Sequence, residues 1–486
     1  MGKLKNLTLL HSNDMHGDFL AEEIDEQLIG GVSMLSGYIS KIRSQKKNTL
    51  YCVAGDMFRG SVIDSEFKGI STIEIMNLLS PDVVTLGNHE TDYGIGHLLF
   101  IEKCAKFPII NANFYIRHNR RRLFKPCIVK KIGGMKILFI GILTEQVLNE
   151  TKKDNTIGTM VDIAGAVKEV ERICNSYRSE DIDLTVLLTH IGFEEDKKLA
   201  SQLSPSLGVD VIIGGHSHTL LDEPVVVNDI IIAQAGVGTN QIGQFDFVID
   251  TDLNRVASYE WKCVNINQDN CPVDDGMERL LNGYKEVTDA KFNRIITRLK
   301  KELTHPSRTE ETSLGNLCSD ILKESLGIDI MLKGSGGIRS KSLGPTVTYG
   351  DLTACFPFDD AIYQFIATGA QLRKMFLYIL RDEQWIEHCE FYQVSKGIEI
   401  EYIKSEKRLT KFNFMGKPIT DDQTFTVGIE QYHYINLEKF TSVSTDEVEQ
   451  NGKARVISTS GNQIYEEYLS EHQLLDADVE GRINVL

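Results

Sequence analysis

The sequence predicts an α/β fold for the N-terminal part of the chain and a separate second domain after it. From the start to about residue 262, short apolar runs alternate with amphipathic segments of helix length, and this alternation is typical of α/β proteins. Past Thr304 the pattern changes to a different succession of helices, strands and glycine-rich turns. A chain of 486 residues is also too long for one compact core, so two domains are expected.

Seven apolar runs of the N-terminal part have the length of buried strands. They cover residues 7–10, 49–53, 82–86, 136–142, 183–189, 209–213 and 229–234. Between them, residues 32–46 and 163–177 show the 3.6-residue spacing of helices that pack on a sheet. Strands and helices therefore follow one another as in an open α/β sheet.

A charge-rich stretch, residues 273–302, has apolar positions at helical spacing and predicts a long connecting helix. The C-terminal part then shows a helix over 314–326, a glycine-rich turn at 334–337, and strands over 397–403 and 424–428. The predicted organisation is one domain over residues 1–265, a linker over 266–303 and a second domain over 304–486.

The chain is acidic, with 69 Asp and Glu against 52 Lys and Arg and a formal net charge of −17. Such a surface repels nucleic-acid phosphate and anionic membranes, so we expect neither a nucleic-acid polymer nor a membrane as partner. A small phosphorylated ligand is compatible with this charge if metal ions or a few arginines supply positive charge locally.

Targeting signals are not evident in the sequence. The apolar run at the N-terminus is too short for the core of a signal peptide, and no window approaches the ~18 apolar residues of a transmembrane helix. Nine cysteines with scattered spacing and no Cys-x-x-Cys motif fit reduced thiols. We therefore expect a cytoplasmic protein, unless a leader peptide has been removed.

Polar residues follow five of the predicted strands. The segments are Asn13-Asp14-Met15-His16, Gly55-Asp56, Gly87-Asn88-His89-Glu90-Thr91-Asp92, Thr189-His190 and Gly215-His216-Ser217-His218. Ligands bind outside the carboxyl ends of the strands in open α/β sheets, so these side chains are expected to converge. Each motif alone is common as a structural feature, whereas imidazoles and carboxylates at strand end after strand end predict a metal site.

The residue types indicate which ions such a site would hold. Carboxylates, imidazoles and an amide oxygen without thiolate suit Mn²⁺, Zn²⁺, Co²⁺ or Fe. Six or seven ligands are too many for one open site and enough for two divalent ions. A carboxylate shared by two ions holds them about 3.5–4 Å apart, generates a bridging hydroxide and clamps phosphoryl oxygens. The pattern therefore predicts phosphoester hydrolysis.

The ordered set of Asp-x-His, Gly-Asp, Gly-Asn-His-Glu, His and Gly-His-x-His motifs resembles the calcineurin-like metallophosphatases. The later motifs Ser335-Gly336-Gly337-Ile338-Arg339 and Phe356-Pro357-Phe358 narrow the resemblance to the 5'-nucleotidase, UDP-sugar hydrolase and 2',3'-cyclic nucleotide phosphodiesterase branch. The resemblance covers nearly the whole chain. It implies a four-layer αββα metallophosphatase sandwich, followed by an α+β domain of the 5'-nucleotidase C-terminal type.

The resemblance also assigns roles in the first domain. Seven residues are implied as ligands of two metal ions: Asp14, His16 and His218 for one, Asn88, His190 and His216 for the other, and Asp56 as the bridge. His89 is implied as the catalytic group that gives a hydrogen bond or a proton to the phosphoryl group. Asp92 would fix its tautomer and favour its charged form, and the alternative for Asp92 is a helix N-cap. Glu90 receives only a supporting role.

In this family the second domain supplies the nucleotide-binding groups and rotates onto the metal centre. The implied substrate-binding residues are Arg339, Gly336, Gly337, Phe358, Tyr432 and Glu438. Arg339 would reach a phosphate or the ribose, and Glu438 falls where the family has a ribose-binding Asp. Phe358 and Tyr432 would stack on the two faces of a base, and core packing is the alternative for both.

Several positions depart from the family pattern. Gly334 stands where Asn is usual, and residues 435–440 replace a Gly-Gly-Asp-Gly segment. Asp359-Asp360 stand where Gly-Asn is common, and Arg308 is out of register with a family arginine. We therefore expect intact catalysis with altered substrate selection.

The leading interpretation is a dinuclear-metal phosphomonoesterase of the 5'-nucleotidase type, acting on a nucleotide or a related small phosphoester through the bridging hydroxide. A 2',3'-cyclic nucleotide phosphodiesterase and a nucleotide-sugar pyrophosphatase are alternatives, because the same two ions serve all three reactions. A more distant alternative is a non-catalytic nucleotide-binding protein. It predicts lost metal ligands, and the sequence retains all seven.

Overall fold

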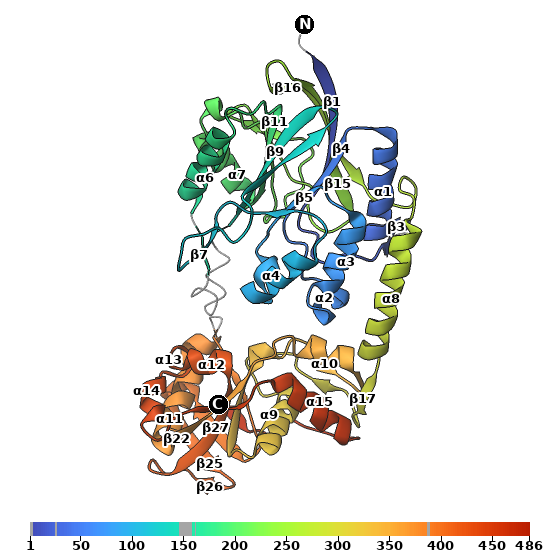
Figure 1. The fold of residues 1–486 in the computed structure, drawn as a ribbon. Helices are drawn as coiled ribbons and strands as arrows, with labels where there is room; N and C mark the ends of the chain where they lie inside the picture. Colours follow the sequence, from blue (N-terminus) through green and yellow to red (C-terminus); the bar gives the residue numbers. More distant parts are fainter. Residues whose placement is uncertain (1–2, 25–26, 145–157, 161, 386–388) are drawn as a thin grey trace. The chain divides into compact units, whose positions relative to one another are not determined.

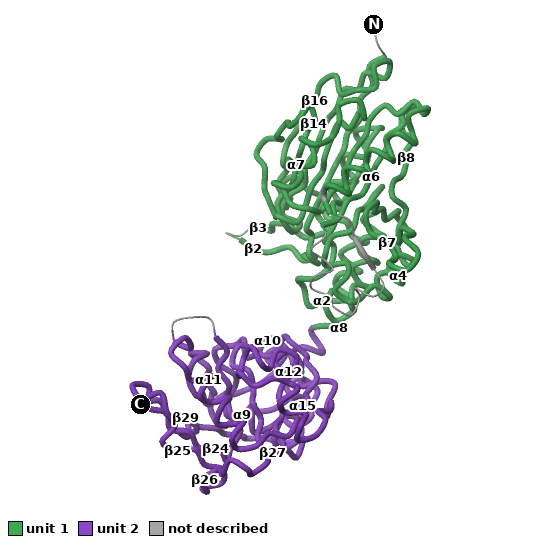
Figure 2. The backbone as a smooth tube through the Cα atoms, turned by 90° about the vertical axis from the view of Figure 1, so that its left-hand side faces the viewer, with its two compact units in different colours: residues 1–288 green, residues 289–486 purple. Residues whose placement is uncertain are grey.

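The structure is a computed structural model that describes residues 3–24, 27–144, 158–160, 162–385 and 389–486. The chain divides into two compact units, Met1–Thr288 and Asp289–Leu486 (Figure 2). Each unit has its own buried apolar clusters and is described by itself.

The first unit contains two six-stranded mixed sheets (Figure 1). One sheet consists, in spatial order, of β16 (Arg255–Asn265), β15 (Gln241–Asp250), β1 (Leu4–Ser12), β4 (Thr49–Ala54), β5 (Val83–Thr85) and β6 (Ile109–Ile110). The other consists of β13 (Val225–Val227), β14 (Ile230–Ala233), β12 (Val211–Ile213), β11 (Leu184–His190), β9 (Met135–Leu143) and β8 (Cys127–Ile132). Strands β1, β4, β5 and β6 run parallel, as do β9, β11, β12 and β14.

The two sheets pack face to face between layers of helices. Leu9 points into the cluster between the sheets, together with Phe139 and Val186 of the second sheet. Its neighbour Leu10 points the other way, into the cluster that includes Leu35. Successive residues of a strand face opposite sides, so a strand covered on both faces is apolar throughout. This αββα order confirms the α/β prediction.

The helices of the first unit cover the outer faces of the sheets. Those packed on the first sheet are α1 (Val32–Gln45), α3 (Ile70–Leu79) and α4 (Ile95–Cys104), with the short α2 (Val62–Glu66) and η1 (His89–Thr91) in the loops. Those packed on the second are α6 (Ile163–Ser176) and α7 (Phe193–Gln202), followed by η3 (Pro205–Leu207). Two small antiparallel strand pairs complete the unit: β2 (Glu22–Ile24) with β3 (Gln27–Ile29), and β7 (Phe114–Ile116) with β10 (Gly158–Met160).

All seven predicted strands are present, with ends shifted by a few residues. The antiparallel pair β15–β16 was not predicted. Polar residues such as Gln244 and Asp246 interrupt β15, and the edge strand β16 contains only half-buried and exposed residues, so neither strand is a continuous apolar run. The helix predicted over 273–302 is α8 (Asp275–Phe292) and ends early. Residues 295–298 instead form β17, where β-branched side chains favour a strand.

The second unit is built on a five-stranded mixed sheet. In spatial order it consists of β23 (Tyr392–Val394), β19 (Ile330–Gly334), β27 (Thr424–Glu430), β22 (Ile362–Thr368) and β28 (Arg455–Ser458). Ile330 and Leu332 pack with residues of helix α11 on one face. Met331 packs with residues of α9 and α15 on the other face. The sheet therefore lies between two apolar clusters.

The remaining elements of the second unit surround this sheet. A four-stranded sheet consists of β26 (Lys417–Pro418), β25 (Arg408–Phe414), β24 (Ile398–Ile403) and β29 (Ile483–Val485). Two short pairs are β17 (Ile295–Arg298) with β21 (Thr346–Thr348), and β18 (Leu303–Thr304) with β20 (Ser342–Leu343). The helices are α9 (Ser313–Leu326), α10 (Tyr349–Cys355), α11 (Gly369–Ile379), α12 (Gln431–Ile435), α13 (Leu437–Thr441), α14 (Thr445–Glu449) and α15 (Gly461–Glu471), with the turns η4 (Ser335–Gly337), η5 (Asp382–Trp385) and η6 (Lys404–Glu406).

Within the described ranges, every helix is too short or too polar to cross a lipid bilayer.

Candidate metal centre

The carboxyl ends of five parallel strands in the first unit converge on one cluster of polar side chains. The cluster receives Asp14 and His16 after β1, Asp56 after β4, Asn88 after β5, His190 at the end of β11, and His216 and His218 after β12. The two sheets pack face to face, so their strand ends meet at the same edge. The structure thus brings together all seven predicted ligands.

One part of the cluster contains Asp14, His16 and His218. The Nε2 atoms of the two imidazoles lie 3.0 Å apart. The Asp14 Oδ1 atom lies 3.6 Å from Nε2 of His218 and 3.9 Å from Nε2 of His16. The second Asp14 oxygen accepts a hydrogen bond from the Asn13 side chain at 2.7 Å, which holds the carboxylate in place.

The other part contains Asp56, His190 and His216, together with the Asn88 side chain. The Asn88 Oδ1 atom lies 2.9 Å from His216 Nδ1 and 3.2 Å from His190 Nε2. One Asp56 oxygen, Oδ2, lies 3.0 Å from His190 Nε2 and 3.8 Å from Nε2 of His16. Asp56 therefore faces both parts of the cluster.

His190 is fully buried and its orientation is defined. Its Nδ1 lies 2.8 Å from the Ala54 carbonyl oxygen and donates to it, which leaves Nε2 facing Asp56 and Asn88. Burial opposes the charged imidazolium, but the Asp56 and Asp14 carboxylates outweigh it and raise the pKa of His190 to about 9. The same contact with His190 lowers the pKa of Asp56 despite its burial.

Five of the seven residues have a left-handed backbone conformation, which L-residues other than Gly adopt uncommonly. They are Asp14, His16, Asp56, His216 and His218, with φ values of 50°, 50°, 52°, 81° and 52°. Strained backbone of this kind persists where the surrounding structure enforces it and concentrates at functional sites. The turns thus aim these side chains at one point at a conformational cost.

Glu90 is the residue whose importance the sequence did not reveal. Its carboxylate is buried and accepts backbone hydrogen bonds from Asp56 at 3.0 Å and Met57 at 2.7 Å, and also from Gly87. Burial and the neighbouring Asp56 raise the pKa of Glu90 to about 7. One side chain therefore ties the loop after β4 to the loop after β5. The Gly-Asn-His-Glu motif was the only signal for it.

His89 lies beside the cluster and is held by Asp92. Its Nδ1–H donates to Asp92 Oδ2 at 2.8 Å, and a ring nitrogen of His89 lies within 4.8 Å of ligand atoms of His16 and Asp56. The hydrogen bond to Asp92 raises the pKa of His89, although burial acts against it. Arg59 donates to the same Asp92 oxygen at 2.7 Å, a contact that the sequence did not reveal.

The N-cap alternative for Asp92 is wrong. The N-cap of the following helix α4 is Gly94, and it makes no side-chain cap hydrogen bond. The Asp92 carboxylate contacts His89 and Arg59 instead.

A buried polar network supports the loop that carries His216 and His218. Asp196 accepts hydrogen bonds from Thr189 at 2.6 Å and from Gln234 at 3.0 Å. Gln234 in turn accepts a hydrogen bond from Ser217 at 3.0 Å. Burial raises the pKa of Asp196 to about 7. This network connects the end of β11 to the loop after β12.

The donor set fits divalent metal ions. Within each of the three overlapping groups of side chains, the ligand atoms all lie within 4.8 Å of one another. The donors are imidazole nitrogens and carboxylate oxygens, with an amide oxygen beside them, and the His16 and His218 Nε2 atoms lie 3.0 Å apart. Lone pairs that face one another in a buried site are stabilised by a cation, and this mixture suits Mn²⁺, Zn²⁺ or a related ion.

In the second unit, Phe358 and Tyr432 are each 53% exposed, so they are not core residues. The Arg339 guanidinium carbon lies 5.8 Å from the centroid of the Phe358 ring. Glu438 is exposed in the first turn of α13. Arg339 and Phe358 are therefore neighbours on the surface of this unit.

The turn η4 contains Gly336 and Gly337 and rests on charged groups. The Gly336 N–H donates to the Glu390 carboxylate at 2.8 Å. A Cβ at Gly337 would lie 3.0 Å from Lys333 Nζ, and Lys333 forms a buried ion pair with Glu430. A Cβ at Gly334 would lie 2.4 Å from His433 Nε2, so Asn does not fit there.

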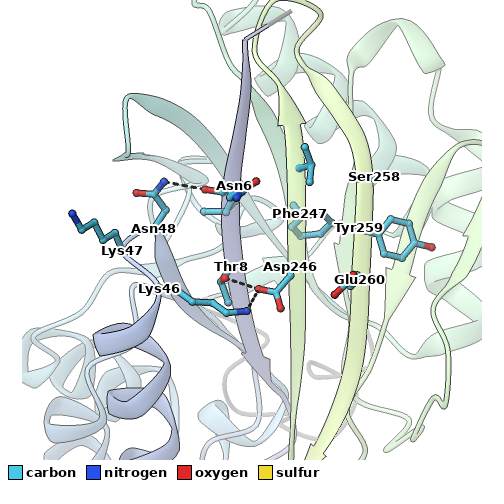
Figure 3. Close-up of a pocket in the computed structure, with 12 residues that line it drawn as sticks. Asn6, Thr8, Lys46, Lys47, Asn48, Asp246, Phe247, Ser258, Tyr259 and Glu260 are labelled. Atoms are coloured by element: carbon cyan, nitrogen blue, oxygen red, sulfur yellow. Dashed lines mark hydrogen bonds and ion pairs between the residues drawn. The ribbon is translucent and has the colours of Figure 1, made fainter.

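In the first unit, a cavity of about 670 Å³ opens on the first sheet (Figure 3). Its lining includes residues of β1, β15 and β16. Asp246 accepts hydrogen bonds from Lys46 and Thr8, each at 2.6 Å, so the polar groups at its centre satisfy one another. None of the predicted site residues lines this cavity.

Comparisons with known proteins agree with this architecture. Residues 7–220 match the calcineurin-like phosphoesterase family, and residues 294–445 match the 5'-nucleotidase C-terminal domain. The chain is 26% identical to the 5'-nucleotidase of Mus musculus, with 98% of this chain and 90% of the relative covered. It is 25% identical to the trifunctional nucleotide phosphoesterase protein YfkN of Bacillus subtilis, with 83% of this chain and 29% of the relative covered.

A solved structure is similar over the same extent. The 5'-nucleotidase precursor of Thermus thermophilus superposes with a TM-score of 0.62 and 25% identity, covering 99% of both chains. The two family matches lie in the two units of the structure, and the first of them contains the converging Asp, Asn and His side chains. The chain therefore belongs to the calcineurin-like phosphoesterases that carry a 5'-nucleotidase C-terminal domain.

Proposed function

We propose that this protein hydrolyses nucleotide phosphomonoesters with the help of two divalent metal ions. The convergence of seven potential ligands on one point, with Asp56 facing both halves of the cluster, is the observation that carries this proposal. Asp14, His16 and His218 would hold one ion, and Asn88, His190 and His216 the other. When bound, the ions would activate water and neutralise phosphoryl oxygens.

The protein's own groups account for the remaining steps. His89 carries a proton on Nδ1 that is held by Asp92, and this contact favours the imidazolium form. Its Nε2–H is then free to donate to the phosphoryl group as the leaving oxygen departs. Asp92 orients the imidazole, and Arg59 stabilises the Asp92 carboxylate. In the second unit, Arg339, Phe358, Tyr432 and the Gly336–Gly337 turn would bind the nucleotide.

A phosphate-release assay tests the proposal. The full chain is incubated with Mn²⁺, Zn²⁺ or Co²⁺ and with AMP, other nucleoside monophosphates or an aryl phosphate. Metal-dependent release from nucleoside monophosphates is expected, together with loss of activity in EDTA and its return when metal is added. Absence of metal-dependent turnover on every substrate would reject the proposal.

A phosphodiesterase activity is the second candidate. The relative from B. subtilis is named a trifunctional nucleotide phosphoesterase, which indicates that one protein of this kind acts on more than one phosphoester. The ratio of rates with AMP, a 2',3'-cyclic nucleotide and UDP-glucose separates a monoesterase from a diesterase or pyrophosphatase. A higher kcat/KM for either of the latter two would assign the protein to the second candidate.

We also propose that the protein works in a reducing compartment. All nine cysteines are free, including the buried Cys52, Cys318 and Cys355. Reduced thiols are the rule in the cytoplasm. Fractionation of the source cells tests this assignment, and recovery outside the cytoplasm would contradict it.

A further inference from the structure

The second unit exposes two aromatic side chains that the strand pairing places near each other. Phe358 and Tyr432 keep about half of their surface in solvent. Strands β22 and β27 pair with Ile362 opposite Glu430, and the Gln431 N–H donates to the Ala361 carbonyl at 2.8 Å. The continuation of this register sets Asp360 opposite Tyr432. Asp360 also follows Phe358 by only two residues, so it is near Phe358 along the chain and opposite Tyr432 across the strand pair.

The Asp360 carboxylate is held at this position. The backbone N–H of Tyr432 interacts with it, while burial and the nearby Glu430 raise its pKa. Among the described residues, no side-chain cation lies within ion-pair distance of Asp360, because the nearby Lys333 pairs with Glu430. The carboxylate is half-buried and retains free acceptor positions.

The preceding residue, Asp359, is used differently. Its Oδ1 accepts hydrogen bonds from Ser460 Oγ at 2.7 Å and from the Asn462 N–H at 3.1 Å. These contacts fasten the loop to the start of α15. Asp359 is thus held at the start of α15 through one of its oxygens, whereas Asp360 is the carboxylate that the strand register places opposite Tyr432.

We propose that Asp360 is a specificity-determining residue that selects guanine over adenine nucleotides. A carboxylate only accepts hydrogen bonds, so it matches an edge that presents two adjacent donors, and guanine offers N1–H and N2–H in this arrangement. Adenine presents an acceptor, N1, beside its N6 amino group, and this lone pair faces the carboxylate unfavourably. The inference rests on the proposed function, because it assumes that a nucleotide binds with its base on Phe358 and Tyr432.

Relative turnover of GMP and AMP tests the inference in the metal-loaded full chain. We expect kcat/KM for GMP to exceed that for AMP by about tenfold, the effect of one charged hydrogen bond. Asp360→Asn should reverse the preference, since an amide donates to adenine N1 and accepts from its amino group. Asp359→Asn removes the same charge from the neighbouring residue and should preserve the wild-type ratio.

The controls separate this inference from the proposed function. Hydrolysis of an aryl phosphate, which has no base, should be equal in the wild-type protein and in Asp359→Asn. A wild-type preference for AMP, or an unchanged GMP to AMP ratio in Asp360→Asn, overturns the inference while the aryl phosphatase activity still supports hydrolysis. If no substrate is turned over, calorimetry with guanosine and adenosine decides, and equal affinities overturn the inference. If Asp360→Asn fails to fold, the ratio of kcat/KM for GMP and AMP in the wild-type protein decides whether the inference holds.

Discussion

Single residues in the metal centre act on several loops at once. Glu90 accepts backbone hydrogen bonds from both the Asp56 loop and the Gly87 turn. The same Asp92 oxygen receives hydrogen bonds from His89 and Arg59. Glu90 and Asp92 fix the positions of neighbouring candidate ligands and of His89. Their substitution is therefore expected to affect metal binding and catalysis, although neither residue is proposed as a ligand or proton donor.

His89 and Asp56 should differ when each is replaced by Ala. His89→Ala should lower kcat by about 10²–10⁴-fold, the usual contribution of a general acid, and retain metal. Asp56→Ala should lose metal, because Asp56 faces both halves of the cluster. Elemental analysis of the purified variants, together with steady-state rates, measures both effects. Loss of metal from His89→Ala would show that His89 is a ligand. His118→Ala is the control, because it removes an exposed imidazole.

His11 should make the protein sensitive to acid. Its imidazole is fully buried, with Nε2 accepting from Trp261 at 3.4 Å and Nδ1 without a partner, and burial lowers its pKa to about 3. The unfolded chain takes up this proton near the ordinary value of about 6.5, whereas the folded chain does not. Stability is therefore fully present above pH ~6.5 and falls as the pH decreases toward 3, by about 2 kcal/mol at pH 5.

His11→Gln tests this effect, because Gln accepts from Trp261 and does not titrate. The free energy of unfolding is measured by urea denaturation at pH 7.5 and pH 5 for both proteins. The loss between the two pH values should be smaller in the variant by about 2 kcal/mol. Equal losses would assign the acid sensitivity to other groups.

At the level of elements, the short turns after the strands decide the geometry of the centre. Residues in the turns that follow the strands adopt left-handed backbone conformations or pack directly against the backbone of a neighbouring loop. Gly87 connects β5 to η1 with no room for a side chain: a Cβ there would lie 2.1 Å from Asp56 Oδ1 and 2.3 Å from the Asp56 nitrogen. Close approach of the two loops thus depends on this glycine.

Gly87→Ala should weaken metal binding, because the added methyl group displaces Asp56 or the turn that holds Asn88. We expect a loss of affinity of about 10–100-fold, as for other changes behind metal ligands. Gly96→Ala is the matched control, since Gly96 lies in α4 and a Cβ there has no neighbour within 4 Å. Metal titration followed by calorimetry compares them. Equal affinities in the two variants would contradict the steric argument.

At the level of the whole molecule, the candidate metal ligands and the residues proposed to bind nucleotide belong to different compact units. Each unit has its own apolar clusters, so each is expected to unfold on its own. The two tryptophans of the chain report on them separately: Trp261 lies in β16 of the first unit and Trp385 in η5 of the second.

Removal of metal should destabilise only the first unit. Without cations, Asp14, Asp56 and the surrounding imidazoles stay close together with unneutralised charge. In EDTA, the thermal transition seen by Trp261 fluorescence in Trp385→Phe should fall by about 5–10 °C. The transition seen by Trp385 in Trp261→Phe should not move. A shift of both transitions would show that the units unfold together.

Much of the fold and the membership of the candidate centre could be predicted from the sequence. The strands of the parallel sheets are covered on both faces, so each is a continuous apolar run that the chain displays locally, as in Leu7 to Leu10. The candidate ligands follow these runs directly, and the structure brings all seven together. Their individual roles stay predictions.

The remaining features depend on contacts between segments far apart in the chain. Polar residues interrupt β15, and β16 is half-buried or exposed along its length, so only their pairing beside β1 distinguishes them from loops. Glu90 accepts hydrogen bonds from a loop that lies more than 30 residues earlier in the sequence. Arg59 and Asp92 form their hydrogen bond across a similar separation in sequence. The sequence by itself determined which chemical groups stand at the strand ends. Only the tertiary structure decided which residues fix those groups in position. A buried carboxylate such as that of Glu90 acts through the N–H groups that donate to it, and these come from distant parts of the chain.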